Sequence, residues 1–279
     1  MAEILDGKKF SKKIKNDLKL EVDKLKENGL KPKLAVIMVG KDPASMVYVR
    51  NKSKACEKIG IEFEEFLLEE NIEEKELFDL IDKLNSDKKI TGILLQAPIP
   101  KHLDINKAFE KIDPNKDVDG FNPVNVGKLS IGVDGFISCT PFGIMKLLEE
   151  YNIDLEGKNA VIIGRSNIVG KPMAQCLLAK NATVTICHSR TKNIAELTKN
   201  ADIIITAIGK PKFLTEDMVK NNSIIIDVGI NRMEDGSLIG DVDFENIEKK
   251  ASYITPVPGG VGPMTIAMLM YNVVKAAKK

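Results

Sequence analysis

Four features are scarce in this sequence of 279 residues: long apolar runs, net charge, cysteine and histidine. No segment is apolar over the length that crosses a membrane, which is about 20 residues. Residues 1–13 have scattered charges and no apolar stretch, so we expect no secretory signal there. These absences favour a cytoplasmic protein with no membrane partner.

Positive and negative charges are nearly balanced, with 41 lysines and arginines against 40 aspartates and glutamates. Nucleic-acid phosphates are usually bound by an excess of basic residues, so we expect no nucleic-acid partner. The hydrophobic fraction of 43% is ordinary for a globular protein, and the length allows two domains.

Cysteine and histidine give no support to a metal site or to thiol chemistry. None of the four cysteines forms a C-x-x-C pair, and only His102 and His188 could join them in a zinc site. We therefore predict no bound metal and small, buried, reduced thiols. The cysteines are Cys56, Cys139, Cys176 and Cys187.

The first half of the chain alternates helical and strand patterns, which predicts a parallel sheet covered by helices. Helices are expected at 8–28, 44–58 and 72–85, and strands at 34–39, 61–68 and 90–95. The stretch 98–141 is rich in proline, glycine, asparagine and aspartate. It is expected to be irregular and to end near a domain junction.

The second half has the layout of a doubly wound nucleotide-binding sheet. Strands are expected at 158–164, 182–187, 202–208 and 223–228, and helices at 140–150, 172–180, 191–200 and 264–274. We expect residues 1–138 and 264–279 to form one domain and residues 139–263 the other. The last helix then packs back on the first domain.

The first strand of this second half runs into a glycine turn, Gly164 to Gly170, and then into a helix. A dinucleotide fingerprint reads G-x-G-x-x-G at such a turn, and here Ser166 replaces the second glycine. The amides at a helix N-terminus favour a phosphate at this position. The alternative interpretation is a plain strand-to-helix turn.

The end of the second strand indicates which dinucleotide is bound. NAD-binding domains usually have an acidic residue there, whereas this chain has His188-Ser189-Arg190-Thr191. A serine and an arginine suit a phosphate on the ribose, and Arg165 could reach the same group. We expect NADP rather than NAD. The alternative is that Arg190 is a solvated surface charge.

In the first half, Tyr48 and Lys52 have the i, i+4 spacing that places two side chains on one helix face. A phenol near an ammonium is a competent pair for moving protons. The same spacing is also typical of a lysine that extends past a half-buried tyrosine to reach water.

Polar residues also follow the third strand of the first half. Gln96 ends this strand, at the edge where open sheets bind ligands, and Asp117 and Asp119 follow in the irregular stretch. A carboxylate can pair with two adjacent N–H groups of a ligand, or either acid could cap the turn at Gly120. A loop at 255–265 contains glycines that would let the backbone approach a flat ligand, or that form a hinge.

These segments together resemble the bifunctional methylenetetrahydrofolate dehydrogenase/methenyltetrahydrofolate cyclohydrolase family. They occur in family order over nearly the whole chain and are jointly specific. Ala97 and Ile99 depart from the leucines common in the family, which implies a small change in pocket shape. The matching segments are Tyr48-Val-Arg-Asn-Lys52-x-Lys54, Gln96-Ala-Pro-Ile-Pro100, Asp117-Val-Asp-Gly-Phe121, Gly164-Arg-Ser-x-x-Val-Gly170-x-Pro172, His188-Ser-Arg-Thr191 and Pro258-Gly-Gly-Val-Gly-Pro-Met-Thr265.

The resemblance implies a role for each matching residue. Lys52 resembles the central catalytic group, with Tyr48 and Gln96 shaping its hydrogen bonds. Asp119 resembles the residue that binds the pterin. Further substrate contacts implied are Tyr48, Pro98, Gly259 and Gly260. The NADP contacts implied are Gly164, Arg165, Ser166, Ser189, Arg190 and Ile230.

The expected fold is therefore α/β with two domains, a smaller folate-site domain and a Rossmann-type NADP domain. The resemblance implies oxidation of methylenetetrahydrofolate, then hydrolysis to formyltetrahydrofolate, by a homodimer in one-carbon metabolism and purine biosynthesis. Three alternatives stay open: a dehydrogenase without the hydrolytic step, a short-chain alcohol dehydrogenase, and an NADP-sensing module without activity. The short-chain enzymes have their glycine turn before the Tyr–Lys pair, whereas here the pair comes first.

Overall fold

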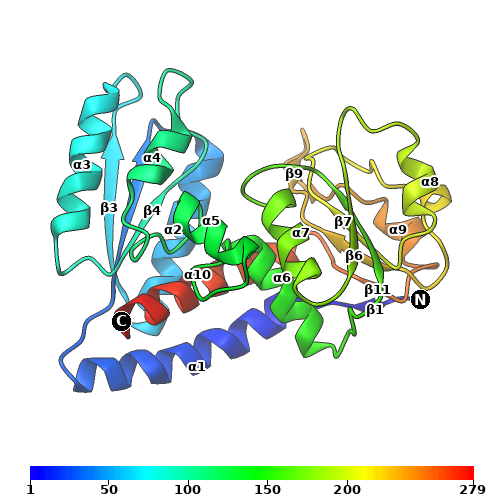
Figure 1. The fold of residues 1–279 in the computed structure, drawn as a ribbon, viewed down its shortest axis with the longest axis horizontal. Helices are drawn as coiled ribbons and strands as arrows, with labels where there is room; N and C mark the ends of the chain where they lie inside the picture. Colours follow the sequence, from blue (N-terminus) through cyan, green and yellow to red (C-terminus); the bar gives the residue numbers. More distant parts are fainter. The chain divides into compact units, whose positions relative to one another are not determined.

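The computed structural model describes residues 1–279 as two compact units, which we name by their sheets (Figure 1). The three-stranded unit contains Lys12–Ile137 and Ile266–Lys279. The six-stranded unit contains Met1–Ser11 and Ser138–Thr265. The two are of nearly equal length, so the expectation that the first is smaller was wrong.

The three-stranded unit is built on a parallel sheet in the order β3 (Glu62–Leu68), β2 (Lys33–Val39), β4 (Gly92–Leu95). Its central strand is apolar on both faces because helices cover both. Ile37, Ile93 and Leu95 point to the face that is covered by α3 and α4. Figure 1 shows α2 on the other side of β3 from α3. The helices are α2 (Pro43–Ile59), α3 (Glu74–Ser86), α4 (Ile105–Lys111) and α5 (Pro123–Ser130), with most of α1 (Gly7–Glu27) and α10 (Val261–Ala277).

The six-stranded unit is a parallel sheet with helices on both faces (Figure 1). Its strand order is β1 (Glu3–Ile4), β11 (Tyr253–Ile254), β8 (Ile224–Asp227), β7 (Ile203–Thr206), β5 (Asn159–Ile163), β6 (Thr183–Cys187). From β5 the chain goes first to β6 on one side and then to β7 on the other, which makes a topological switch point between β5 and β7. The other elements are α6 (Cys139–Glu150), α7 (Gly170–Leu178), α8 (Ile194–Thr198), the 3₁₀ helix η1 (Glu216–Met218), α9 (Phe244–Ile247) and the hairpin of β9 (Asn231–Arg232) and β10 (Leu238–Ile239).

The predicted fold class is confirmed, but the stretch 98–141 is less irregular than expected, because it contains α4 and α5. Each helix starts at a side-chain cap that satisfies its first amides. Asp104 accepts hydrogen bonds from the amides of Asn106 and Lys107, and Asn122 accepts one from Val124 before Pro123 at the first helical position. The prolines and asparagines of this stretch therefore start helices as well as turns.

The predicted domain boundaries differ from the two units at the N-terminus. We expected residues 1–138 in one domain, but β1 pairs in parallel with β11, at the edge of the six-stranded sheet. Ala2 is buried in the core of that unit. The last helix does return to the three-stranded unit, where the Asn272 side chain of α10 donates to the Val118 carbonyl at 2.9 Å.

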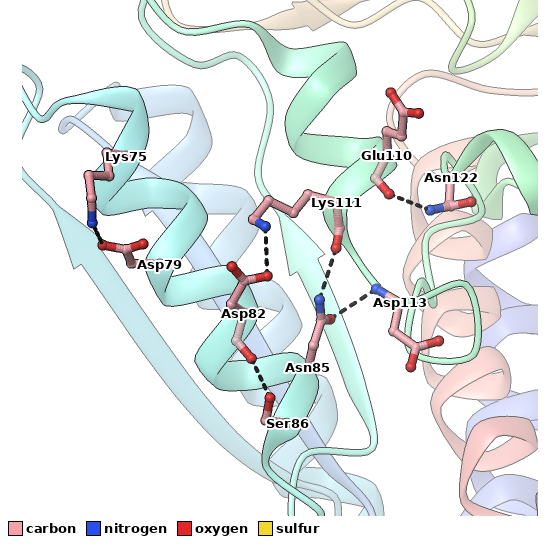
Figure 2. Close-up of polar contacts among 9 residues, drawn as sticks. All are labelled: Lys75, Asp79, Asp82, Asn85, Ser86, Glu110, Lys111, Asp113 and Asn122. Atoms are coloured by element: carbon pink, nitrogen blue, oxygen red, sulfur yellow. Dashed lines mark hydrogen bonds and ion pairs between the residues drawn. The ribbon is translucent and has the colours of Figure 1, made fainter.

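The segment that contains Asp117 and Asp119 is attached to α3 by hydrogen bonds (Figure 2). The Asn85 side chain donates to the Lys111 carbonyl at 2.8 Å and accepts from the Asp113 amide at 2.9 Å. Farther along, the Asn122 side chain donates to the carbonyls of Phe109, Glu110 and Ile112. The segment from 111 to 122 is thus fixed at both ends.

All four cysteines are free thiols and buried, as predicted. Burial raises the pKa of Cys56 and of Cys176 to about 12, so both thiols stay protonated at neutral pH. None of the helices combines the length and the apolar character that a membrane crossing needs.

Candidate functional site

In the three-stranded unit the structure brings Lys52 and Gln96 together. Lys52 lies on the buried face of α2 and is only 9% exposed. Gln96 directly follows β4, and its amide continues the sheet ladder by donating to the Ile37 carbonyl at 2.8 Å. The Lys52 Nζ donates to Gln96 Oε1 at 2.9 Å. The side-chain Nε2 of Gln96 donates to the Ala97 carbonyl at 2.6 Å. The orientation of both side chains is therefore set.

The position of Lys52 depends on the ends of α2. Asp42 caps the helix by accepting from the Ser45 amide at 2.7 Å, and Pro43 follows at the first helical position. Gly60 ends the helix at φ +86°, where an L side chain would be strained. These caps fix the rotation of the helix, so that Lys52 and Cys56 face the core together.

Tyr48 lies one helical turn before Lys52 on α2, as the spacing predicted, and is 38% exposed. Its ring therefore borders solvent while the lysine is buried. A buried amine with a fixed hydrogen-bond partner and a phenol one turn away can exchange protons with a bound molecule. Pro98 is exposed just after Gln96.

Of the two acids in the irregular stretch, Asp117 is the turn cap. It is 2% exposed and accepts hydrogen bonds from the Gly120, Phe121 and Asn122 amides and from the Asn125 side chain. Burial raises the pKa of Asp117 despite these hydrogen bonds. Asp119 is half-buried.

Asp119 belongs to a segment that runs beside β4. A parallel bridge joins Ile93 to Asp117, so the chain beyond Asp117 continues in the direction in which β4 runs towards Gln96. The segment therefore extends towards the carboxyl edge of the sheet, where Gln96 lies, which makes Asp119 the better candidate for a ligand contact.

In the six-stranded unit the predicted glycine turn lies at the switch point. Gly164 follows β5 at φ +129°, and a Cβ on it would lie 2.5 Å from the Ala207 carbonyl oxygen. A Cβ on Gly170 would lie 2.2 Å from the carbonyl oxygen of Gly164. Both distances are too short for a Cβ. Glycine is required at position 164 by the close approach of the chain after β7, and at position 170 by the return of the turn onto the Gly164 carbonyl.

The other predicted cofactor residues lie in loops at the carboxyl ends of the same strands. Arg165 and Ser166 are exposed after β5, and Ser189 and Arg190 after β6. Ser166 Oγ accepts from the Val169 amide at 3.1 Å, directly before α7, and its O–H can act as a donor. No acidic residue stands at the end of β6.

Ile230 follows β8 and is 43% exposed, which is unusual for an isoleucine beside a buried strand. The fit of these loops to a dinucleotide is good, because bare backbone, two guanidinium groups and an exposed apolar side chain lie at the carboxyl edge of one sheet.

The loop at 255–265 has a packing reason for its glycines. Gly259 has φ +115°, and a Cβ on Gly260 would lie 2.7 Å from the Pro256 carbonyl oxygen. The start of α1 packs against this loop, since the Lys8 amide donates to the Gly259 carbonyl at 2.7 Å. A substrate contact by Gly259 and Gly260 remains a prediction.

The sequence interpretation did not include Asp227 and Asp241, two buried carboxylates of the six-stranded unit. The sequence does mark them, because a glycine lies two residues after Asp227 and another directly before Asp241. A Cβ on Gly240 would lie 1.8 Å from Asp227 Oδ2, and one on Gly229 would lie 2.2 Å from Asp241 Oδ1. No group of three or more histidine, cysteine or acidic residues that could hold a metal occurs in residues 1–279.

The pKa of Asp227 should lie well above that of an ordinary aspartate. Burial, with a smaller contribution from Asp241, raises the pKa of Asp227 from 3.8 to about 6, against hydrogen bonds from the Asp241, Val242 and Gly229 amides. Because the folded protein binds this proton more tightly than the unfolded chain, the stability contributed is full below about 3.8 and is lost as pH rises to about 6.

We expect the carboxyl-carbon NMR signal of Asp227 to titrate with a midpoint near 6. Asp202 of the same unit is the control, since hydrogen bonds from Lys220 and Asn159 outweigh its burial and lower its pKa below 3.8. A midpoint for Asp227 near 3.8 would contradict the burial argument.

Comparison with known proteins gives a similar division of the chain. Residues 5–119 match the family model of the tetrahydrofolate dehydrogenase/cyclohydrolase catalytic domain, and residues 138–279 match that of the NAD(P)-binding domain of the same family. The bifunctional protein FolD of Acetivibrio thermocellus is 60% identical over 277 residues, which cover 99% of this chain and 97% of that protein.

Solved structures agree with these matches. The bifunctional enzyme FolD, a methylenetetrahydrofolate dehydrogenase/cyclohydrolase from Campylobacter jejuni, has a TM-score of 0.98 and 55% identity, covering 100% of this chain and 99% of that one. The Trypanosoma brucei N5,N10-methylenetetrahydrofolate dehydrogenase-cyclohydrolase, complexed with NADP cofactor and inhibitor, has a TM-score of 0.95 and 37% identity, covering 99% and 97%. The chain belongs to the tetrahydrofolate dehydrogenase/cyclohydrolase family, and its NAD(P)-binding domain follows its catalytic domain.

Proposed function

We propose that this protein oxidises methylenetetrahydrofolate to methenyltetrahydrofolate with NADP, and then hydrolyses the methenyl product to formyltetrahydrofolate. The observation that carries the proposal is the buried hydrogen bond of 2.9 Å between Lys52 Nζ and Gln96 Oε1, in a chain of this family. Burying a lysine amine costs free energy, and buried ionisable groups of this kind are typical of catalytic sites.

NADP, when bound, accepts the hydride that the methylene carbon gives up. We assign its phosphates to the start of α7, where backbone N–H groups and the helix dipole favour anions. Arg190 and Ser189, with Arg165, suit the extra phosphate of the adenosine ribose, because a guanidinium forms two parallel hydrogen bonds to it. We assign Gly164 and Ser166 to the dinucleotide backbone, and Ile230, which is exposed, to the apolar surface of a flat ring.

In the hydrolytic step the oxygen of a water molecule bonds to the methenyl carbon. One proton of this water leaves to solvent, and the other moves to the nitrogen whose bond to that carbon breaks. Lys52 is the group that takes up and delivers a proton, because Gln96 fixes its orientation. Tyr48, one turn away, shapes the hydrogen bonds around it.

Substrate recognition is assigned to the residues that the family motifs imply. The Asp119 carboxylate suits the paired N–H groups of the pterin ring, because it can accept two hydrogen bonds at once. Tyr48 and Pro98 offer exposed surface to the pterin. Gly259 and Gly260 offer backbone without side chains.

Three further assignments follow from family resemblance. The protein acts in the cytoplasm, in the one-carbon metabolism that serves purine biosynthesis, and it forms a homodimer through the nucleotide-binding domain. Its partners are small tetrahydrofolate derivatives.

The test of this function is an assay with methylenetetrahydrofolate and either NADP or NAD, in which reduced nicotinamide and methenyl absorbance are followed together. We expect reduction with NADP and only a small or transient methenyl signal. A persistent methenyl signal would mean a dehydrogenase without effective hydrolysis. Absence of reduction with both nucleotides would reject the folate function and favour a binding module.

Replacing Lys52 with methionine separates the two steps. We expect Lys52→Met to lower hydrolysis of methenyltetrahydrofolate by about 100-fold or more, which is the usual size of a general acid–base contribution, while some hydride transfer remains. Lys58→Met, six residues along α2 and exposed, lies outside the family motif; it is the control and should leave both rates nearly unchanged. Full hydrolysis by Lys52→Met would refute the role of this lysine.

Replacing Arg190 tests the choice of nucleotide. We expect Arg190→Ala to raise the dissociation constant of NADP by about 10- to 100-fold, because a hydrogen bond between charged groups is worth about 1.5–3 kcal/mol. The affinity for NAD should change little. Lys199→Ala, which removes an exposed charge after α8, is the control. Equal effects of Arg190→Ala on both nucleotides would reject this assignment.

A further inference from the structure

Asp241 binds two different loops of the six-stranded unit, one through its backbone and the other through a side chain. Its side chain is fully buried and accepts hydrogen bonds from the consecutive amides of Ile208, Gly209 and Lys210, at 2.8, 3.0 and 2.8 Å. These three residues follow β7. The Asn231 side chain, which follows β8, donates to the same carboxylate at 3.1 Å. One carboxylate thus holds the chain after two neighbouring strands.

A second carboxylate holds Asp241 in place. Asp227, at the end of β8, accepts from the Asp241 amide at 3.0 Å and from the Val242 amide at 2.9 Å. It also accepts from the Gly229 amide at 2.9 Å. The glycines at 229 and 240 leave the space that the two carboxylates occupy. The arrangement is rigid because almost every acceptor position of both side chains is used.

The hydrogen bonds to Asp241 also fix the direction of the carbonyls after β7, because each peptide group is planar and trans. A carbonyl points opposite to the N–H of the same peptide, so amides that point at Asp241 turn the carbonyls of Ala207, Ile208 and Gly209 away from it. The Ala207 carbonyl is the one that lies against Gly164 at the switch point. Gly209 is exposed, and so is Ile230 next to Asn231.

We propose that Asp241 is a positioning residue for the dinucleotide: it acts from behind the loops after β7 and β8, setting the direction of the carbonyls and the position of Ile230 against which the cofactor lies. This inference rests on the proposed function, because it assigns those loops to NADP. Asp241 itself touches neither cofactor nor substrate.

The test is the variant Asp241→Asn, which keeps the shape but places N–H donors and a neutral oxygen among backbone N–H donors. We expect its dissociation constant and KM for NADP to rise about tenfold, as for loss of one strong hydrogen bond. The rate constant kcat at saturating NADP should fall less than threefold, and hydrolysis of added methenyltetrahydrofolate should stay within twofold. A merely structural role would lower stability and all activities together.

Asp202→Asn is the matched control. Asp202 also accepts a backbone amide, that of Asn159 at 2.8 Å, but it lies at the amino ends of β5 and β7. If Asp241→Asn and Asp202→Asn have the same NADP affinity, the proposal is overturned. If Asp241→Asn does not fold, Asn231→Ala takes its place. It removes the one donor from the β8 loop and should raise the NADP dissociation constant a few-fold; an unchanged value would overturn the proposal.

The proposed function and the role of Asp241 can be rejected separately. Wild-type protein that binds no NADP would reject the proposed function. Wild-type protein that binds NADP, together with variants that bind it equally well, would reject only the role of Asp241. Amide hydrogen exchange at 208–210 checks the cause, since it should be faster in Asp241→Asn and unchanged in Asp202→Asn.

Discussion

Buried carboxylates that accept several backbone N–H groups hold the candidate functional loops of this protein. Asp117 does so in the three-stranded unit, and Asp227 and Asp241 do so in the six-stranded unit. A loop after a strand has amides without sheet partners, and leaving them unpaired in the interior is costly. A carboxylate satisfies several at once. The raised pKa values of Asp117 and Asp227 show that burial of these groups still has a cost.

In a parallel sheet, such loops lie at the carboxyl ends of the strands. In each unit the residues assigned to ligands follow the carboxyl ends of strands, where side chains and amides are not needed for the sheet itself. Gln96 follows β4, Gly164 follows β5, and Ile230 follows β8. Tyr48 and Lys52 are the exceptions, since both lie on α2. The caps of this helix therefore matter as much for the chemistry as the strands do.

Features with a strong pattern could be predicted from the sequence. Strands such as β2 and β5 are apolar runs, the glycine turn at Gly164 needs a close approach of two chains, and Tyr48 and Lys52 share a face by spacing alone. Family motifs then named the ligand residues. The hydrogen bond between Lys52 and Gln96 was expected only through the resemblance, because it joins residues 44 positions apart, and the burial of Lys52 was not predicted.

What could not be predicted depends on tertiary contacts or on very short elements. The strand β1 has two residues and gains its partner β11 only from the far end of the chain, so its place in the six-stranded sheet leaves no local pattern. The helix α4 has seven residues and depends on its cap at Asp104. Asp241 is marked in the sequence only by the glycine before it, and its hydrogen bonds to residues 208–210 depend on tertiary contacts.

The central claim is that NADP and folate bind to the loops at the carboxyl ends of the two sheets. Amide hydrogen exchange of the wild-type protein, with each ligand added separately, tests it most directly. The account predicts that NADP slows exchange at 164–170, 189–191, 208–210 and 229–231, and that a tetrahydrofolate derivative slows it at 96–100 and 117–122. Protection at the amino ends of the strands, or at neither edge, would contradict it.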